Sequence, residues 1–144
     1  MFGLFGKKGR EARKSLENLA NADLMQAIVY GCIYVAAADG EIEAEEMKRI
    51  EGMLANDKKL ANFGNELQQI LDKAKADFES GGSRIIRMNA ERELDDLVND
   101  PEGAETVINF MLTVSEADGE IDAKEMVALE RAAKKMGLKL DNYL

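Results

Sequence analysis

A ten-residue segment occurs twice in this chain. Residues 38–47 read ADGEIEAEEM and, 79 residues later, residues 117–126 read ADGEIDAKEM, so eight of the ten positions are identical. In both copies an apolar stretch precedes the Asp-Gly pair, and a stretch with helical spacing of its apolar residues follows it. We therefore expect two similar helix–turn–helix units, at about residues 23–56 and 101–136. Two such units can pack about a pseudo-twofold axis, and that packing brings their turns together.

The rest of the chain predicts further helices and no strands. Apolar residues recur at helical spacing, no window alternates with period two, and Ala, Leu, Met, Glu and Lys favour helices. A chain of 144 residues with 46% apolar residues is long enough to bury a core. We expect an all-α single domain over residues 10–144, after a tail at residues 1–9. About seven helices are predicted, at residues 10–20, 23–38, 44–56, 64–79, 84–99, 101–117 and 123–136.

The distribution of charge limits the function classes. The net charge is −9; residues 1–14 carry a net +4, which leaves −13 for the remainder. Such an acidic body repels nucleic acid and attracts cations or basic partners. The chain has no His and one Cys, which excludes histidine acid–base chemistry, Cys/His zinc sites and an intramolecular disulfide. Cys32 lies in an apolar run and is interpreted as a buried small hydrophobe.

The N-terminal segment bears on location. No stretch reaches the roughly 18 apolar residues of a membrane span, and the first residues do not resemble a secretory signal. We therefore expect a cytoplasmic protein. Phe2, Leu4 and Phe5 precede several basic residues, a combination that also allows weak contact with an anionic membrane surface. The alternatives are a loose or self-docked tail and a peripheral location at the inner membrane.

Turn stability alone explains part of the repeated segment. A Gly after a helix end, then an N-cap residue with Glu three positions later, forms a glycine cap and a capping box. These roles fall to Gly40, Glu43 and Glu46 in the first copy and to Gly119, Asp122 and Glu125 in the second. Asp39 and Asp118 do not fit, because an acid at the C-terminal end of a helix is disfavoured by roughly 0.3–1 kcal/mol.

The acidic residues of the two turns also suggest a cation site. Ten carboxylates lie within residues 39–46 and 116–125. Each turn matches the last eight positions of an EF-hand loop but not the first half, so each offers half a coordination shell. We expect a divalent cation with oxygen ligands, calcium first and magnesium or manganese as alternatives. The candidate ligands are Asp39, Glu43, Glu46, Asp118, Asp122 and Glu125. The alternative is a capped acidic surface without a specific ion.

At these turns the chain resembles the TerB-like family, which is associated with tellurite resistance and stress response. The shared pattern, Ala-x-x-Asp-Gly-x-(Ile/Val)-x-x-x-Glu, occurs at residues 36–46 and, beginning with Ser115, at residues 115–125. The resemblance covers about residues 12–140 and implies an all-α fold. It also implies that acidic residues bind a divalent cation. This role carries over to Asp39, Glu46, Asp118 and Glu125, and more weakly to Glu43 and Asp122.

Three functions follow from these observations. The first is a non-enzymatic cation-binding module that acts through protein partners of a stress-response assembly. The second is an acidic interaction scaffold that needs no ion. The third is a carboxylate metal-dependent hydrolase, disfavoured because no nucleophile–base pair or phosphate loop is evident. Arg84, Arg87 and Arg92 share one helical region and are interpreted as a solvated face rather than a phosphate clamp.

Overall fold

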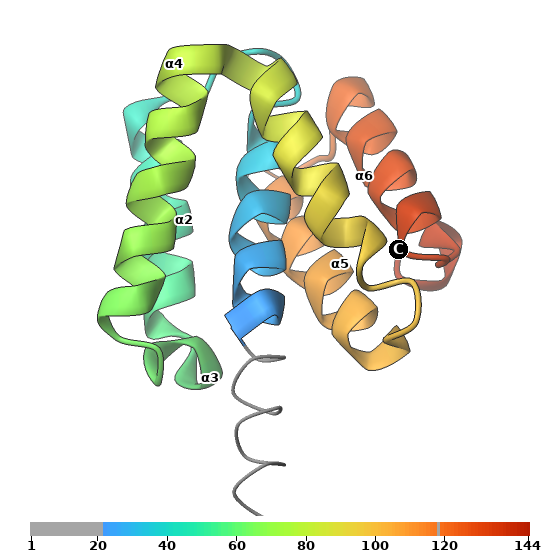
Figure 1. Ribbon diagram of the computed structural model, residues 1–144. Helices are drawn as coiled ribbons and strands as arrows, with labels where there is room; N and C mark the ends of the chain where they lie inside the picture. Colours follow the sequence, from blue (N-terminus) through green and yellow to red (C-terminus); the bar gives the residue numbers. More distant parts are fainter. Residues whose placement is uncertain (1–21, 118) are drawn as a thin grey trace, which may run out of the picture.

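A computed structural model describes residues 22–117 and 119–144, and these residues form helices and connecting turns without a strand (Figure 1). The predicted all-α fold is therefore confirmed. The predicted tail at residues 1–9 and helix at residues 10–20 lie outside the described residues. The elements are a helix at residues 22–36, called the central helix below, then α2 (Ala44–Asn56), α3 (Lys58–Ala61), α4 (Asn65–Asp95), α5 (Pro101–Glu116), α6 (Ala123–Lys135) and the 3-10 helix η1 (Leu140–Asn142).

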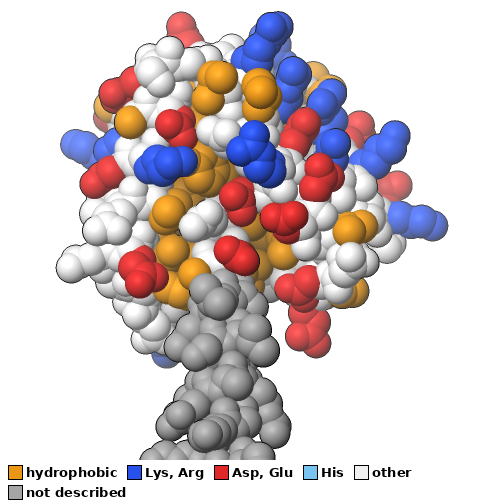
Figure 2. Space-filling model, viewed as in Figure 1, with side chains coloured by type: hydrophobic (Ala, Val, Ile, Leu, Met, Phe, Trp, Pro, Cys, Tyr) orange, Lys and Arg blue, Asp and Glu red, His pale blue; other side chains and the backbone are white. Residues whose placement is uncertain are grey.

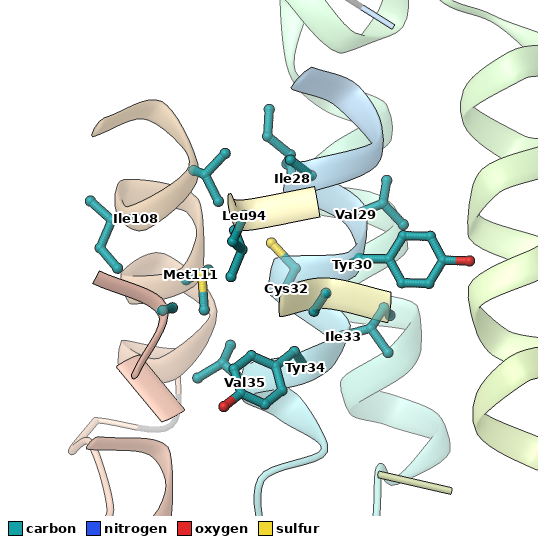
Figure 3. Packing of buried hydrophobic residues seen from close by; sticks show 14 of the residues in the cluster. Ile28, Val29, Tyr30, Cys32, Ile33, Tyr34, Val35, Leu94, Ile108 and Met111 are labelled. Carbon is teal, nitrogen blue, oxygen red and sulfur yellow. The ribbon is translucent and has the colours of Figure 1, made fainter. Parts of the chain in front are cut away.

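The central helix is the most buried element. It is apolar almost all round, as a helix must be when other helices cover every side of it. Its residues from Ala27 to Ala36 are all buried, as is Ala37 in the turn that follows. Figure 3 shows Cys32 and its neighbours on this helix packed with side chains of α4 and α5, among them Leu94, Ile108 and Met111. Gly31 permits a close approach to α5, because a Cβ atom there would lie 3.1 Å from the sulfur of Met111.

α4 takes the place of two predicted helices. The Ser-Gly-Gly-Ser run predicts a break at residues 80–83, and Gly82 has the non-helical angles φ +69° and ψ −162°. The helical assignment continues on both sides of this one residue, so α4 consists of two segments that meet at a kink (Figure 1). α3 is a short helix between α2 and α4, in the interval between two predicted helices, and the Asp57 side chain caps it by accepting from the backbone amides of Lys59 and Leu60.

A polar network holds the two segments of α4 against the central helix. The Tyr30 hydroxyl donates to Asp77 Oδ2 at 2.9 Å, and Asn89 Nδ2 donates to the same oxygen at 3.3 Å. Asp77 belongs to the first segment and Asn89 to the second. Lys73 Nζ donates to the Tyr30 hydroxyl at 3.1 Å. The Asp77 oxygen thus accepts hydrogen bonds from the central helix and from the second segment of α4. These bonds hold the two segments of α4 at a fixed angle.

The C-terminal helices begin where their sequence predicts and end one residue earlier, at Glu116 for α5 and at Lys135 for α6. Asp100 caps α5 by accepting from the amide of Gly103 at 3.1 Å, and Pro101 occupies the first helical position. Gly137 ends α6 with φ +74°. The chain then folds back, so that Leu140 is buried. Among the described helices, none is both long and apolar enough to cross a membrane.

Candidate metal centre at the paired turns

The two repeated turns share their backbone path. The central helix ends at residue 36 and α5 ends at Glu116. The amide of Gly40 donates to the Ala37 carbonyl at 2.9 Å, and the amide of Gly119 donates to the Glu116 carbonyl at 2.9 Å. Gly40 has φ +94° and Gly119 φ +104°, a region that L side chains rarely adopt. The predicted glycine caps are therefore present in both copies.

The two copies differ at the start of the following helix. Asp122 Oδ1 accepts from the Glu125 amide at 2.8 Å, and Glu125 Oε1 accepts from the Asp122 amide at 3.1 Å. This is the predicted capping box. Glu43 occupies the N-cap position of α2 with extended backbone angles, but its side chain makes no capping hydrogen bond. The capping box predicted for the first copy is therefore absent. The extra methylene of Glu places its carboxylate farther from the backbone amides than that of Asp.

Asp39 has a structural role that its spacing does not predict. Its Oδ1 accepts from the backbone amide of Glu41 at 3.0 Å, which closes an Asx-turn across the bend. The inference that Asp39 has no use in turn stability is therefore wrong. The helix dipole alone does not decide the role of an acid at this position, because its side chain also reaches the backbone amide two residues on. Asp118, at the same position of the second turn, lies outside the described residues.

The two turns lie at the same end of the molecule. In Figure 1 the central helix and α5 both finish near the upper end, and α2 and α6 both begin there. Glu46 and Glu125, which are equivalent in the repeat, line one cavity of about 230 Å³. Ala36 and Ile50 of the first unit and Val114 and Ala117 of the second complete much of its wall. Equivalent acidic residues of the two units thus line one cavity.

A guanidinium group shares this cavity. Arg49 lies one turn along α2 from Glu46 and lines the same space, together with Glu125. Glu46, Arg49 and Glu125 each take part in a polar interaction. An arginine beside two carboxylates supplies positive charge without a metal ion. Spacing along the sequence does not reveal this role, because it depends on how the two units pack.

The candidate ligands do not all come together. Within residues 22–117 and 119–144 no three Asp, Glu, His or Cys residues are grouped closely enough to hold a metal ion. Glu46 and Glu125 converge, Asp122 is engaged with Glu125, and Asp39 and Glu43 are exposed at the first turn. A calcium shell needs six to eight oxygen atoms. The described side chains therefore do not form such a shell by themselves.

The fold and the turns together define a class of protein. The chain is an all-helical domain built from a duplicated helix–turn–helix unit, with an acidic turn in each copy. The family model described as tellurite resistance protein TerB matches residues 25–143, which is most of the chain, and the chain therefore belongs to the TerB family. This confirms the family suggested by the repeated motif. No curated protein and no solved structure matches the chain.

Proposed function

We propose that this protein is a non-enzymatic helical module that binds a divalent cation where its two repeated turns meet, and that the bound state presents a surface to a protein partner. The observation that carries the proposal is the cavity that Glu46 and Glu125 line from equivalent positions of the two units. We further propose that this partner belongs to a stress-response assembly, in keeping with the description of the family model as a tellurite resistance protein.

The electrostatics at this end of the molecule favour a cation. The central helix and α5 both end there, and each helix C-terminus carries about half a negative charge on its unpaired carbonyls. The acidic side chains of the two turns add to this potential. A cation between the two helix–turn–helix units would reduce the repulsion between their carboxylates and would stabilise the contact between the units.

Calcium is the first choice among the cations. It accepts six to eight oxygen ligands in flexible geometry, including backbone carbonyls and water, whereas magnesium demands a near-ideal octahedron. The proposed ligands are Asp39, Glu46, Asp118 and Glu125, with Glu43 and Asp122 as weaker candidates. Because Arg49 lines the same cavity, its guanidinium would have to turn away for Glu46 and Glu125 to share the ion.

A second function is an acidic interaction scaffold that needs no ion. The capping box at Asp122 and Glu125 and the presence of Arg49 in the cavity favour it, because each uses carboxylates that a metal would otherwise take. In this case the exposed acids of the turns would meet a basic protein surface. Catalysis is not part of either proposal.

Titration of the full chain with calcium, magnesium and manganese tests the first function. We would follow backbone amide NMR shifts and binding heat for the wild type and for Asp39→Asn/Asp118→Asn. The control is Glu66→Gln/Glu130→Gln, which removes two exposed carboxylates in other parts of the helices. We expect saturable shifts at residues 39–46 and 119–125, and binding at least about tenfold weaker in the turn variant only.

Two outcomes would overturn the cation proposal: a wild type that does not respond, or a turn variant that responds as the wild type does. Salt-sensitive binding of a basic partner that neither calcium nor a chelator changes would then support the scaffold. The turn variant should lose that binding as well, since the same carboxylates would make the contact.

A further inference from the structure

A second cavity, of about 320 Å³, carries the opposite charge. It lies where α6 packs on the second segment of α4 beside the end of the central helix. The polar side chains that line it are Tyr34, Ser83, Arg84, Arg87, Lys124 and Arg131, and its described lining includes no Asp or Glu. We call it the basic pocket. Figure 2 shows Lys and Arg side chains gathered at the upper right of the molecule, over this part of α4 and α6.

This concentration of charge is unusual for so acidic a chain. Outside residues 1–14 the sequence has fourteen Lys and Arg, and four of them line this one pocket. Three of the four, Arg84, Arg87 and Lys124, form no ion pair with any described residue. The fourth, Arg131, pairs with Glu91 of α4 at 2.7 Å. This pair holds Arg131 in place at the edge of the pocket.

Lys124 marks a difference between the two copies of the repeat. The repeated decapeptides differ at two positions, and at one of them Lys124 replaces the acid at Glu45. Lys124 is the second residue of α6, where the positive end of the helix dipole disfavours a cation. The charge of Lys124 thus adds to that of Arg84 and Arg87, although the dipole of α6 disfavours a positive charge at this position.

The negative charge at the C-terminal end of the central helix is too small to balance these cations. Ala37 and Ala38 line the pocket, so it lies beside the C-terminal end of that helix, where the last carbonyls carry the negative end of the helix dipole. Their combined charge is about −0.5, which one cation more than neutralises. An anionic ligand would relieve the remaining repulsion.

The donors around the pocket suit a phosphate group. Arginine side chains bind phosphate oxygens through paired N–H groups, and lysine adds a point charge. Ser83 follows the kink at Gly82, so the first turn of the second segment of α4 begins at the pocket and its amides favour an anion. Burial raises the pKa of Tyr34 although Arg131 lowers it, and the hydroxyl therefore stays a donor at neutral pH.

We propose that the basic pocket binds a phosphate group, carried either by a soluble phosphate ester or by an anionic phospholipid. The apolar side chain of Val127 lines the pocket and is 57% exposed, and the exposed residues Ile85 and Met88 follow the lining residues Arg84 and Arg87 in the sequence. They favour a ligand in which an apolar group accompanies the phosphate. The basic pocket is a different cavity from the one that Glu46 and Glu125 line, although Ala38 and Lys124 belong to the repeated segments, and phosphate binding there does not depend on the cation proposal.

The first experiment uses inorganic phosphate, with EDTA present so that divalent cations play no part. We expect saturable NMR shifts at the amides of Ser83, Arg84 and Lys124. Lys124→Glu restores the residue type of the first copy and improves the helix dipole, so it should fold; we expect it to bind phosphate at least about tenfold more weakly. Lys59→Glu, an equal charge change at the opposite end of the molecule, should bind as the wild type does.

The second experiment separates the two sources of phosphate. The full chain is sedimented with vesicles of phosphatidylglycerol or of phosphatidylcholine. Binding to the first only, weakened by Lys124→Glu and not by Lys59→Glu, identifies the phospholipid. Phosphate shifts without such vesicle binding identify a soluble ester. The proposal is wrong if phosphate gives only small, unsaturated shifts spread over all basic residues and Lys124→Glu leaves vesicle binding unchanged.

Discussion

The difference between the two helix starts can be measured with a matched pair of variants. Asp122 and Glu43 occupy equivalent N-cap positions, but only Asp122 makes side-chain capping bonds. Asp122→Ala removes the acceptor of the 2.8 Å bond from the Glu125 amide. Glu43→Ala removes an exposed carboxylate that caps nothing. Both changes remove one negative charge near a helix N-terminus, so the difference between them isolates the hydrogen bond.

Loss of an Asp N-cap costs about 1 kcal/mol in the free energy of unfolding. We expect this loss for Asp122→Ala, and a change within about 0.5 kcal/mol for Glu43→Ala. For a chain of this length the first corresponds to a fall in Tm of roughly 4 °C. Urea unfolding followed by circular dichroism, with EDTA present, gives the free energy of unfolding of each variant. Equal losses in the two variants would show that the second turn gains nothing from its capping box.

Three further predictions concern the interior and the glycines. Gly52→Ala in α2, where a Cβ atom meets nothing within 4 Å, should raise the free energy of unfolding by about 0.5–1 kcal/mol. Gly119→Ala, at φ +104°, should lower the free energy of unfolding by about 1 kcal/mol. Equal effects of the two substitutions in urea unfolding would contradict the turn geometry. Gly31→Val should cost about 1–3 kcal/mol because its side chain would press on Met111, and a tolerated substitution would show that the central helix and α5 lie farther apart. Burial raises the pKa of the Cys32 thiol well above the value of about 8.5 in the unfolded chain, so stability is complete below that pH and falls by up to about 1.4 kcal/mol per pH unit above it. Cys32→Ala should remove this component, and the native thiol should not react with a disulfide reagent at pH 8.

Most helices follow from the sequence because their apolar spacing is regular. α2 has the predicted bounds, and the central helix stops at residue 36 rather than 38 because the turn begins at Ala37. The break in α4 follows from its glycines. Its form as a kink does not, because it depends on the bonds that Tyr30 and Asn89 make to Asp77. Tertiary contacts of this kind leave no periodic signal.

The candidate sites show the same limit. The pairing of Asp122 with Glu125 follows from local spacing, because a capping box is made within four residues. The Asx-turn of Asp39 depends on the path of the bend. Arg84 and Arg87, interpreted together with Arg92 as a solvated face, join cations of α6 only because α4 packs on α6. Cation binding at the paired turns stays a prediction.

The cavity between the repeated units also bears on how the chain could be divided. Ile50 and Val114 both line it, and each comes from a different copy of the repeated unit. A fragment that contains only the first unit would expose to water the apolar side chains that it contributes to this cavity. We expect such fragments to be poorly structured separately and to recover helical content when mixed, so that the two halves behave as complementary parts rather than as independent modules.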